Sequence, residues 1–305
     1  MQDYEIQERT SEKILLCVAL LAGLGSQAQS IVAALCNEIH APALTARTCV
    51  DGGNSLMFSL LAPGERSLRV LSRLPESSQI QQVAHWQRVH YLAGDRTERW
   101  RTEAFAGETE EAWQRVQALV QKLGREHVMR RYHAALGPLG RIFNISYQLE
   151  PEVESGWVSW QLDRHISPQE ALAACGVGQS WPVAAELLQH LFGHPIAPQY
   201  GPWSIAWSLN EQTPHLRIGT TSWARTFEDV EKRRRLVSLM EQMGGDGRFT
   251  EVLYKLLAAE RPSGSFTRIG RAIEIELCDN QVRAVEAYLC MPQPKQPPLH
   301  AHWSE

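Results

Sequence analysis

The hydrophobic positions of this chain follow two patterns in alternate segments. In some segments they recur every three or four residues, as in a helix, and in others at every second residue, as in a strand. Six stretches carry helix signals, and in the first of them Gly23 and Gly25 predict a break into two helices. The others begin or end at capping residues, prolines or glycines, which are common at helix boundaries. The predicted helices are Ser11–Glu38, Thr109–Leu136, Pro168–Ala174, Pro182–Phe192, Phe227–Met243 and Phe249–Glu260.

Pairs of alternating segments, joined by turn-forming residues, lie between these helices and predict β-hairpins. The segment 78–105 stays open, because it holds either a further hairpin, turning near Gly94 and Asp95, or only helix. The four clear hairpins are Asn54–Leu61 with Ser67–Leu74, Arg141–Leu149 with Trp157–Leu162, Trp203–Leu209 with His215–Thr221, and Thr267–Leu277 with Gln281–Cys290.

The order of helix and hairpin repeats along the chain and favours an α+β fold over a doubly wound parallel sheet. Hairpins that follow one another in sequence pair side by side, and a sheet that closes on itself has no exposed edge. We therefore expect residues 1–305 to form a single domain, a closed antiparallel β-barrel of sequential hairpins surrounded by α-helices. An open α+β sheet, or two stacked α+β halves, is the alternative.

Each predicted strand has one mainly aliphatic face and one polar face. In the second strand, for example, Leu68 and Val70 alternate with Arg69 and Arg73. A solvated sheet face is the ordinary explanation of such alternation. Solvated faces usually carry Lys and Thr, however, whereas these strands contain no Lys and repeat Arg, Trp, Ser and Gly. This composition favours a partly enclosed polar lumen.

Composition and charge limit the kinds of binding partner expected for this protein. The 305 residues are 44% hydrophobic and 21% charged, with a net charge of -4, so no basic excess points to nucleic acid. The six cysteines form no CxxC pair or zinc-type cluster, which is typical of reduced thiols. The apolar run Ile14–Leu24 follows an acidic segment and is too short for a membrane span. We therefore expect a cytoplasmic protein with neither nucleic acid nor membrane as a partner.

Standard catalytic motifs are missing. There is no GxGxxG, P-loop, GxSxG or HExxH motif, and no two aspartates are adjacent, as they are in the magnesium motif of helical isoprenoid synthases. The polar strand faces instead combine arginines, aromatic rings and a few carboxylates. Guanidinium groups suit a diphosphate, aromatic faces stabilise a carbocation, and a carboxylate can accept a proton.

Three segments resemble the soluble aromatic prenyltransferases of the ABBA type, also called prenyltransferase barrels. Val50–Ser59 with Leu68–Pro75 looks like the first hairpin of that family, and Ser159–Trp207 matches its strand–helix–strand spacing. The final hairpin, Ile269–Tyr288, is similar to the last hairpin of the family and of the related cyanobactin peptide prenyltransferases. The resemblance implies a prenyltransferase-barrel fold and the transfer of a prenyl group.

The resemblance also implies roles for single residues. Arg69 falls where magnesium-dependent members carry an aspartate and magnesium-independent members a basic residue, which implies diphosphate binding with no metal site, Mg²⁺ being possible but not required. Arg217 falls on a diphosphate-binding arginine of the family, and Tyr288 on a lumen tyrosine. Two basic positions of the family are replaced, one by Ala284 and another by Ile145 or a neighbour.

Strand alternation adds further candidates on the polar faces. Arg268 and Arg73 would complete the diphosphate site, and Trp157 would line the prenyl and acceptor pocket. Glu274 is the favoured general base, with Glu276 and Glu286 as competitors. The alternatives are ordinary cross-strand Arg–Glu pairs and a core tryptophan. His215 is expected to be structural or exposed, and the basic run 232–235 to be a solvated helix face.

These observations lead to one functional hypothesis. The protein would move a dimethylallyl or longer prenyl group from its diphosphate to an electron-rich acceptor, such as a phenol, an indole or a peptide side chain, without a cofactor. Its partners would then be a prenyl diphosphate and an aromatic or peptide acceptor. Two alternatives stay open: a non-catalytic α+β module that binds a small molecule or a protein, and a hydrolase or lyase acting on a phosphorylated substrate.

Overall fold

The computed structural model describes residues 2–43, 56–64, 67–73, 83–92, 97–105, 110–150, 156–196, 201–209, 215–220, 229–259 and 269–290. Within these ranges the chain forms ten strands, and each strand is antiparallel to both of its neighbours. The strands are β1 Leu56–Ala62, β2 Ser67–Arg73, β3 Val83–Leu92, β4 Thr97–Phe105, β5 Gly140–Glu150, β6 Gly156–Leu162, β7 Trp203–Ser208, β8 His215–Thr220, β9 Gly270–Cys278 and β10 Gln281–Cys290.

Sequential hairpins pair side by side, as the alternating pattern predicts, and the antiparallel α+β class is confirmed. Strand β1 pairs with β10 as well as with β2, so the order of hydrogen-bonded neighbours is that of a closed barrel. The segment 78–105, for which the sequence allowed either a hairpin or helix, contains the hairpin of β3 and β4. Its purely helical interpretation is wrong. Because β3 and β4 lie between β2 and β5, this hairpin is needed to complete the ring.

Eight α-helices accompany the strands within the described ranges. The predicted break at Gly23 and Gly25 is confirmed, and both residues have positive φ, 83° and 52°. The single predicted helix 109–136 is wrong, because Gly124 takes a φ of 64° and ends one helix before the next begins. The helices are α1 Gln2–Leu21, α2 Ala28–Ala43, α3 Glu110–Lys122, α4 Glu126–Leu136, α5 Pro168–Ala174, α6 Trp181–Phe192, α7 Asp229–Gln242 and α8 Gly247–Ala259.

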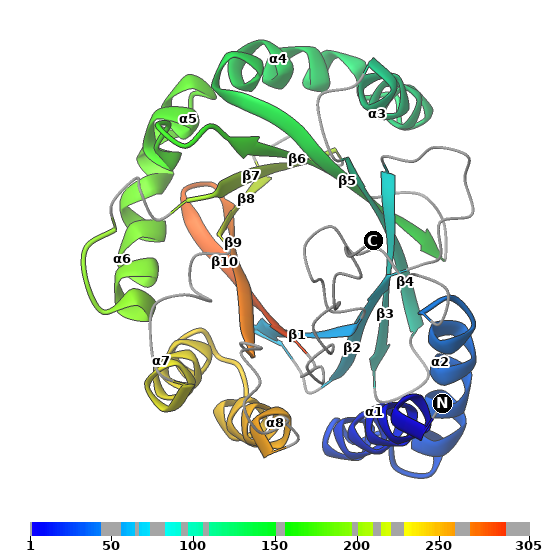
Figure 1. Ribbon diagram of the computed structural model, residues 1–305. Coiled ribbons are helices and arrows are strands. Elements are labelled where there is room, and N and C mark those ends of the chain that lie inside the picture. The colour runs from blue at the N-terminus through cyan, green and yellow to red at the C-terminus, as the bar shows by residue number, and fades with distance from the viewer. Residues whose placement is uncertain are drawn as a thin grey trace, which may run out of the picture.

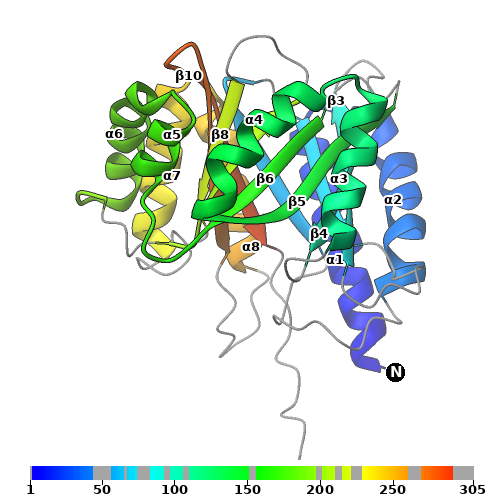
Figure 2. The ribbon, with the colours of Figure 1, turned by 90° about the horizontal axis from the view of Figure 1, so that it is seen from above.

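The helices lie around the outside of the strand ring, and Figure 1 looks down into that ring. Figure 2 shows α3 and α4 along the outside of β5 and β6. The aliphatic strand faces are buried beneath the helices: Leu68, Ile218 and Ile273 are 0% exposed. Burial of each such side chain contributes about 1.5–3 kcal/mol. The hydrophobic core is therefore a layer between helices and barrel, which leaves the opposite strand faces for the lumen.

The strand register brings the polar positions of distant segments together. Arg217 of β8 is opposite Glu276 of β9, and Glu274 of β9 is opposite Glu286 of β10. Tyr288 of β10 is opposite Ser59 of β1. Because directly opposite residues on paired strands share one face of the sheet, these side chains gather on the lumen side of β8, β9 and β10.

Candidate functional site

The carboxylate of Glu276 is held by two residues of β8. Its Oε1 lies 2.7 Å from Nε2 of His215, and its Oε2 accepts a hydrogen bond of 2.9 Å from Nε of Arg217 and lies 2.8 Å from Nη2 of the same guanidinium. Burial alone would raise the pKa of Glu276, but the hydrogen bond from His215 and the charge of Arg217 outweigh it and lower the pKa to about 2. Glu276 is therefore ionised at neutral pH.

Arg217 is the centre of the charged cluster. Its Nη1 lies 3.7 Å from Oε2 of Glu274 and 3.9 Å from Oε2 of Glu286. Its guanidinium carbon lies 4.0 Å from the centre of the Trp157 ring, a cation–π geometry. Burial alone would lower the pKa of Arg217, but the three surrounding carboxylates raise it above its ordinary value. The guanidinium is thus a permanent charge on an aromatic face.

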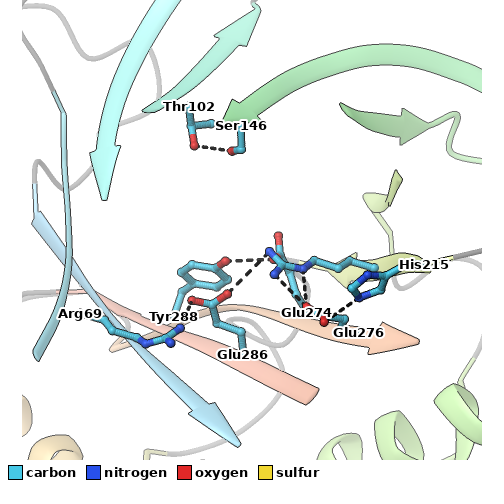
Figure 3. A network of polar contacts seen from close by, with 9 residues as sticks. Arg69, Thr102, Ser146, His215, Glu274, Glu276, Glu286 and Tyr288 are labelled. Carbon is cyan, nitrogen blue, oxygen red and sulfur yellow. Dashed lines mark hydrogen bonds and ion pairs between the residues drawn. The ribbon is translucent and has the colours of Figure 1, made fainter. Parts of the chain in front are cut away.

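Arg69 reaches the same cluster from β2. Its Nη1 lies 3.6 Å from Oε1 of Glu286, whose other oxygen faces Arg217. The Tyr288 hydroxyl donates a hydrogen bond of 2.9 Å to Oε2 of Glu274. Figure 3 shows Arg69, Tyr288 and the three glutamates side by side. Residues of β2, β8, β9 and β10 therefore meet in one polar network.

Further polar contacts lie on β4, β5 and β6, outside the charged cluster. Thr102 of β4 and Ser146 of β5 share a hydrogen bond between their hydroxyls, drawn in Figure 3 away from the charged cluster. Arg141 donates hydrogen bonds of 3.3 and 3.0 Å to the amide oxygen of Gln161, its neighbour across β5 and β6. The three glutamates thus lie with Arg69 and Arg217 on β2, β8, β9 and β10, whereas Arg141 and the two hydroxyl groups belong to β4 and β5.

Most of the residues proposed from the sequence lie in this cluster. Arg69, Arg217, Glu274, Tyr288 and Trp157 are joined by the contacts above, and so are the competing carboxylates. Two candidates fall partly or wholly outside the described residues. Arg268 is not described, and of Arg73 only the backbone is, paired with Trp86 at the end of β2.

His215 is the residue that sequence reasoning undervalued. It was expected to be structural or exposed; at 7% exposed it is not exposed, and its ring meets the Trp157 ring edge-on at 4.9 Å, which agrees with the structural alternative. The signal was present in the alternation, because His215 and Arg217 are two positions apart on one strand and share its lumen face. Nothing in the sequence linked His215 to Glu276, which lies on another strand.

Ala284 stands where the resembling family carries a basic residue, and the structure shows what lies beside it. Ala284 of β10 is opposite Glu276, so a basic side chain expected beside this carboxylate is missing from that position. Both described cluster arginines are instead ion-paired with glutamates of β9 and β10. A bound anion would therefore have to replace carboxylates as the partner of these guanidinium groups.

Two structural features are absent from the described part of the chain. No group of three or more His, Cys, Asp or Glu side chains there is arranged so that it could hold a metal ion. No helix there is long and apolar enough to cross a membrane.

Comparison with known proteins finds similarity at the level of structure alone. No protein-family model matches the chain, and no curated protein matches it. The 6-dimethylallyltryptophan synthase from Micromonospora olivasterospora, in complex with DMASPP and Trp, superposes with a TM-score of 0.67 and 13% identity over 93% of this chain and 98% of that one.

Two further solved structures agree. The 5-dimethylallyltryptophan synthase from Streptomyces coelicolor gives a TM-score of 0.64 at 15% identity, over 93% of this chain and 97% of that one. AnaPT from Neosartorya fischeri gives 0.66 at 10% identity, over 92% of each chain. These values show that the chain has the fold of these proteins.

Proposed function

We propose that this chain, which has the fold of aromatic prenyltransferases, is itself a prenyltransferase that forms a single prenyltransferase-barrel domain over residues 1–305. It would move a dimethylallyl or longer prenyl group from its diphosphate to an electron-rich aromatic or peptide side-chain acceptor. The observation that carries the proposal is the meeting of Arg69 and Arg217, from β2 and β8, at one carboxylate inside a barrel of this fold. The similar structures include enzymes in complex with tryptophan and a prenyl diphosphate analogue.

The cluster suits the binding of the donor. Arg69 and Arg217 present guanidinium groups to one place, and these groups bind phosphate oxygens well. Arg73 and Arg268 are proposed to add to this site from their strand positions. A diphosphate would take the place of Glu286 between the two arginines. Because Arg69 falls where the magnesium-independent members of the resembling family carry a basic residue, we propose that Mg²⁺ is not required.

The chemistry would follow from the neighbours of the donor. The bond between the prenyl carbon and the diphosphate oxygen breaks, and the leaving group takes the electron pair to the arginines. The face of Tyr288 would shield the allylic cation from water, while Trp157 lines the pocket behind the Arg217 guanidinium that lies on its ring. The acceptor then forms a bond to the prenyl carbon and loses a proton, for which Glu274 is the proposed base. Glu274 is the most exposed of the three carboxylates, at 31%, against 16% for Glu276 and 4% for Glu286.

The proposal is tested with the purified protein, radiolabelled dimethylallyl, geranyl and farnesyl diphosphate, and acceptors that include tryptophan, simple phenols and short peptides. We expect transfer of label to at least one acceptor, with loss of donor binding in Arg217→Ala. Arg234→Ala is the matched control, because Arg234 is 77% exposed and forms an ion pair with Glu231 of its own helix, away from the charged cluster.

Each possible result has a distinct meaning. Failure to bind any prenyl diphosphate would exclude the proposal. Binding without any transfer would favour a non-catalytic binding module, and release of diphosphate with a free prenyl alcohol would favour a hydrolase. We also propose a cytoplasmic location, which imaging of the tagged full-length chain in its native cell would test.

A further inference from the structure

His215 has no role in the function proposed above, yet it is built into the charged cluster. It is the first residue of β8, two positions before Arg217, and is 7% exposed. Its ring packs edge-on against Trp157, the residue on which the Arg217 guanidinium also lies. A polar side chain with this degree of burial usually has a defined hydrogen-bonding role.

The protonation of the two partners defines the direction of their hydrogen bond. Glu276 has a pKa of about 2 and is a carboxylate at neutral pH, so its oxygens only accept hydrogen bonds. His215 Nε2 lies 2.7 Å from Oε1 and must therefore carry a proton and donate it to this bond. His215 and Arg217 thus hold one oxygen each of the same carboxylate.

This arrangement restricts the orientation of Arg217. Its Nε donates to Oε2 of Glu276 and its Nη2 is ion-paired with the same oxygen, which leaves Nη1 on the side of Glu274 and Glu286. Rotation of the Glu276 carboxylate would break the bond to His215 at its other oxygen. The Trp157 ring supports the guanidinium plane from one face. The Nη1 group is therefore directed to the place where Arg69 meets Glu286.

We propose that His215 is a positioning residue: its Nε2–H fixes Glu276, and Glu276 in turn holds Arg217 with Nη1 directed toward the diphosphate site. That this site binds diphosphate rests on the function proposed above. The contacts from His215 through Glu276 to Arg217 do not depend on that function. His215 contacts no substrate in this scheme and acts only through Glu276.

Two substitutions separate hydrogen bonding from packing. His215→Gln keeps an N–H donor at about the reach of Nε2, whereas His215→Phe keeps the ring against Trp157 and removes the donor. We expect His215→Phe to raise KM for the prenyl diphosphate about tenfold, the loss typical of one hydrogen bond to a charged group. Its kcat should change less than KM, because the donor already carries its diphosphate charge when it binds, before the bond breaks. His215→Gln should stay close to the wild type.

A double-variant cycle tests whether His215 acts through Glu276. The combination of His215→Phe with Glu276→Gln should be no worse than Glu276→Gln alone, since the positioning chain is already broken. Fully additive losses would overturn the proposal. So would an unchanged KM in His215→Phe, or an equal rise of KM in His215→Gln. If His215→Phe does not fold, His215→Asn replaces it, because asparagine keeps the amide of glutamine but is too short to reach Oε1.

A second measurement is independent of prenyl transfer. In arginine-labelled protein, the Nε–H signal of Arg217, assigned through its loss in Arg217→Lys, should be protected from solvent exchange by the bond to Glu276. We expect faster exchange in His215→Phe and unchanged exchange in His215→Gln. An unchanged signal in His215→Phe would overturn the positioning role. If exchange of Arg217 Nε–H is faster in His215→Phe but the protein binds no prenyl diphosphate, the positioning role of His215 is supported and only the proposed prenyltransferase function is excluded.

Discussion

At the scale of single residues, Glu286 is the group that most directly affects the proposed donor site. It is 4% exposed, and its two oxygens lie 3.6 Å from Arg69 Nη1 and 3.9 Å from Arg217 Nη1. These are ion pairs longer than good hydrogen bonds, so they hold the arginines by charge more than by geometry. Glu286 therefore occupies, within the protein, the place proposed for the diphosphate.

This position predicts that Glu286→Gln binds prenyl diphosphate more tightly. The substitution keeps the shape of the side chain and removes the charge that competes for both arginines. The dissociation constant should fall about three- to tenfold, because the desolvation cost of these buried charges offsets most of their Coulomb attraction. Calorimetric titration with a thiolodiphosphate analogue measures it. Glu251→Gln is the control, because Glu251 pairs with Lys255 on the exposed side of α8. Weaker binding by Glu286→Gln would show that Glu286 supports the donor instead of competing with it.

At the scale of elements, the helices are joined to the barrel by specific contacts as well as by apolar packing. Glu103 of β4 is 7% exposed on the helix-covered side, and it accepts hydrogen bonds from Arg115 of α3 and from the Tyr147 hydroxyl of β5. Tyr132 of α4 stacks on Trp207 of β7 at 3.6 Å. Such contacts require α3 and α4 to be separate helices with different directions, and the break between them is at Gly124.

We expect Gly124→Ala to destabilise the protein by about 1–2 kcal/mol, the cost of placing a side chain in the left-handed region. Gly124 has a φ of 64°, and an added methyl group would meet no atom within 4 Å, so the penalty comes from the backbone alone. Denaturant unfolding measures this change. Gly124→Asn is the matched control, because asparagine tolerates positive φ better than alanine does, so its cost in free energy of unfolding should be smaller. Equal effects of both substitutions would contradict the explanation.

At the scale of the whole molecule, the ring of strand pairs connects segments that are far apart in the chain. Strand β1 pairs with β10, and the cluster joins Arg69 to residues of the final hairpin. No described strand has an unpaired edge, and none can leave the barrel without breaking pairs on both sides. The first hairpin and the last should therefore depend on each other for stability.

This interdependence predicts that the protein unfolds in a single cooperative transition, as a single domain does. Far-UV circular dichroism, which follows the helices and strands, and near-UV circular dichroism, which follows the packed tryptophans, should give the same midpoint in denaturant. Two separate transitions would show instead that the chain is divided into independently folding parts, and the proposal of a single domain would then be wrong.

Much of the fold follows from local pattern. The alternation along β10 placed Glu286 and Tyr288 on one face, and the bounds of that strand, Gln281–Cys290, are confirmed. The local sequence pattern was insufficient where the same residues fit both a helix and a hairpin. The segment 78–105 combines polar and apolar positions without a clear period, and its pairing with β2 and β5 selects the hairpin. Gly124 carried a usable signal, because glycine tolerates positive φ, but an isolated glycine also occurs inside helices.

The sequence alone determined which faces of the strands are polar, because the side-chain alternation of a strand is a property of its backbone. It therefore identified Arg69, Arg217, Glu274 and Tyr288 as residues of one lumen. The tertiary structure decided which of these groups touch, since the register between β8, β9 and β10 is formed by pairing over many residues. Only that register places His215 on Glu276, and only the pairing of β1 with β10 brings Arg69 to Glu286.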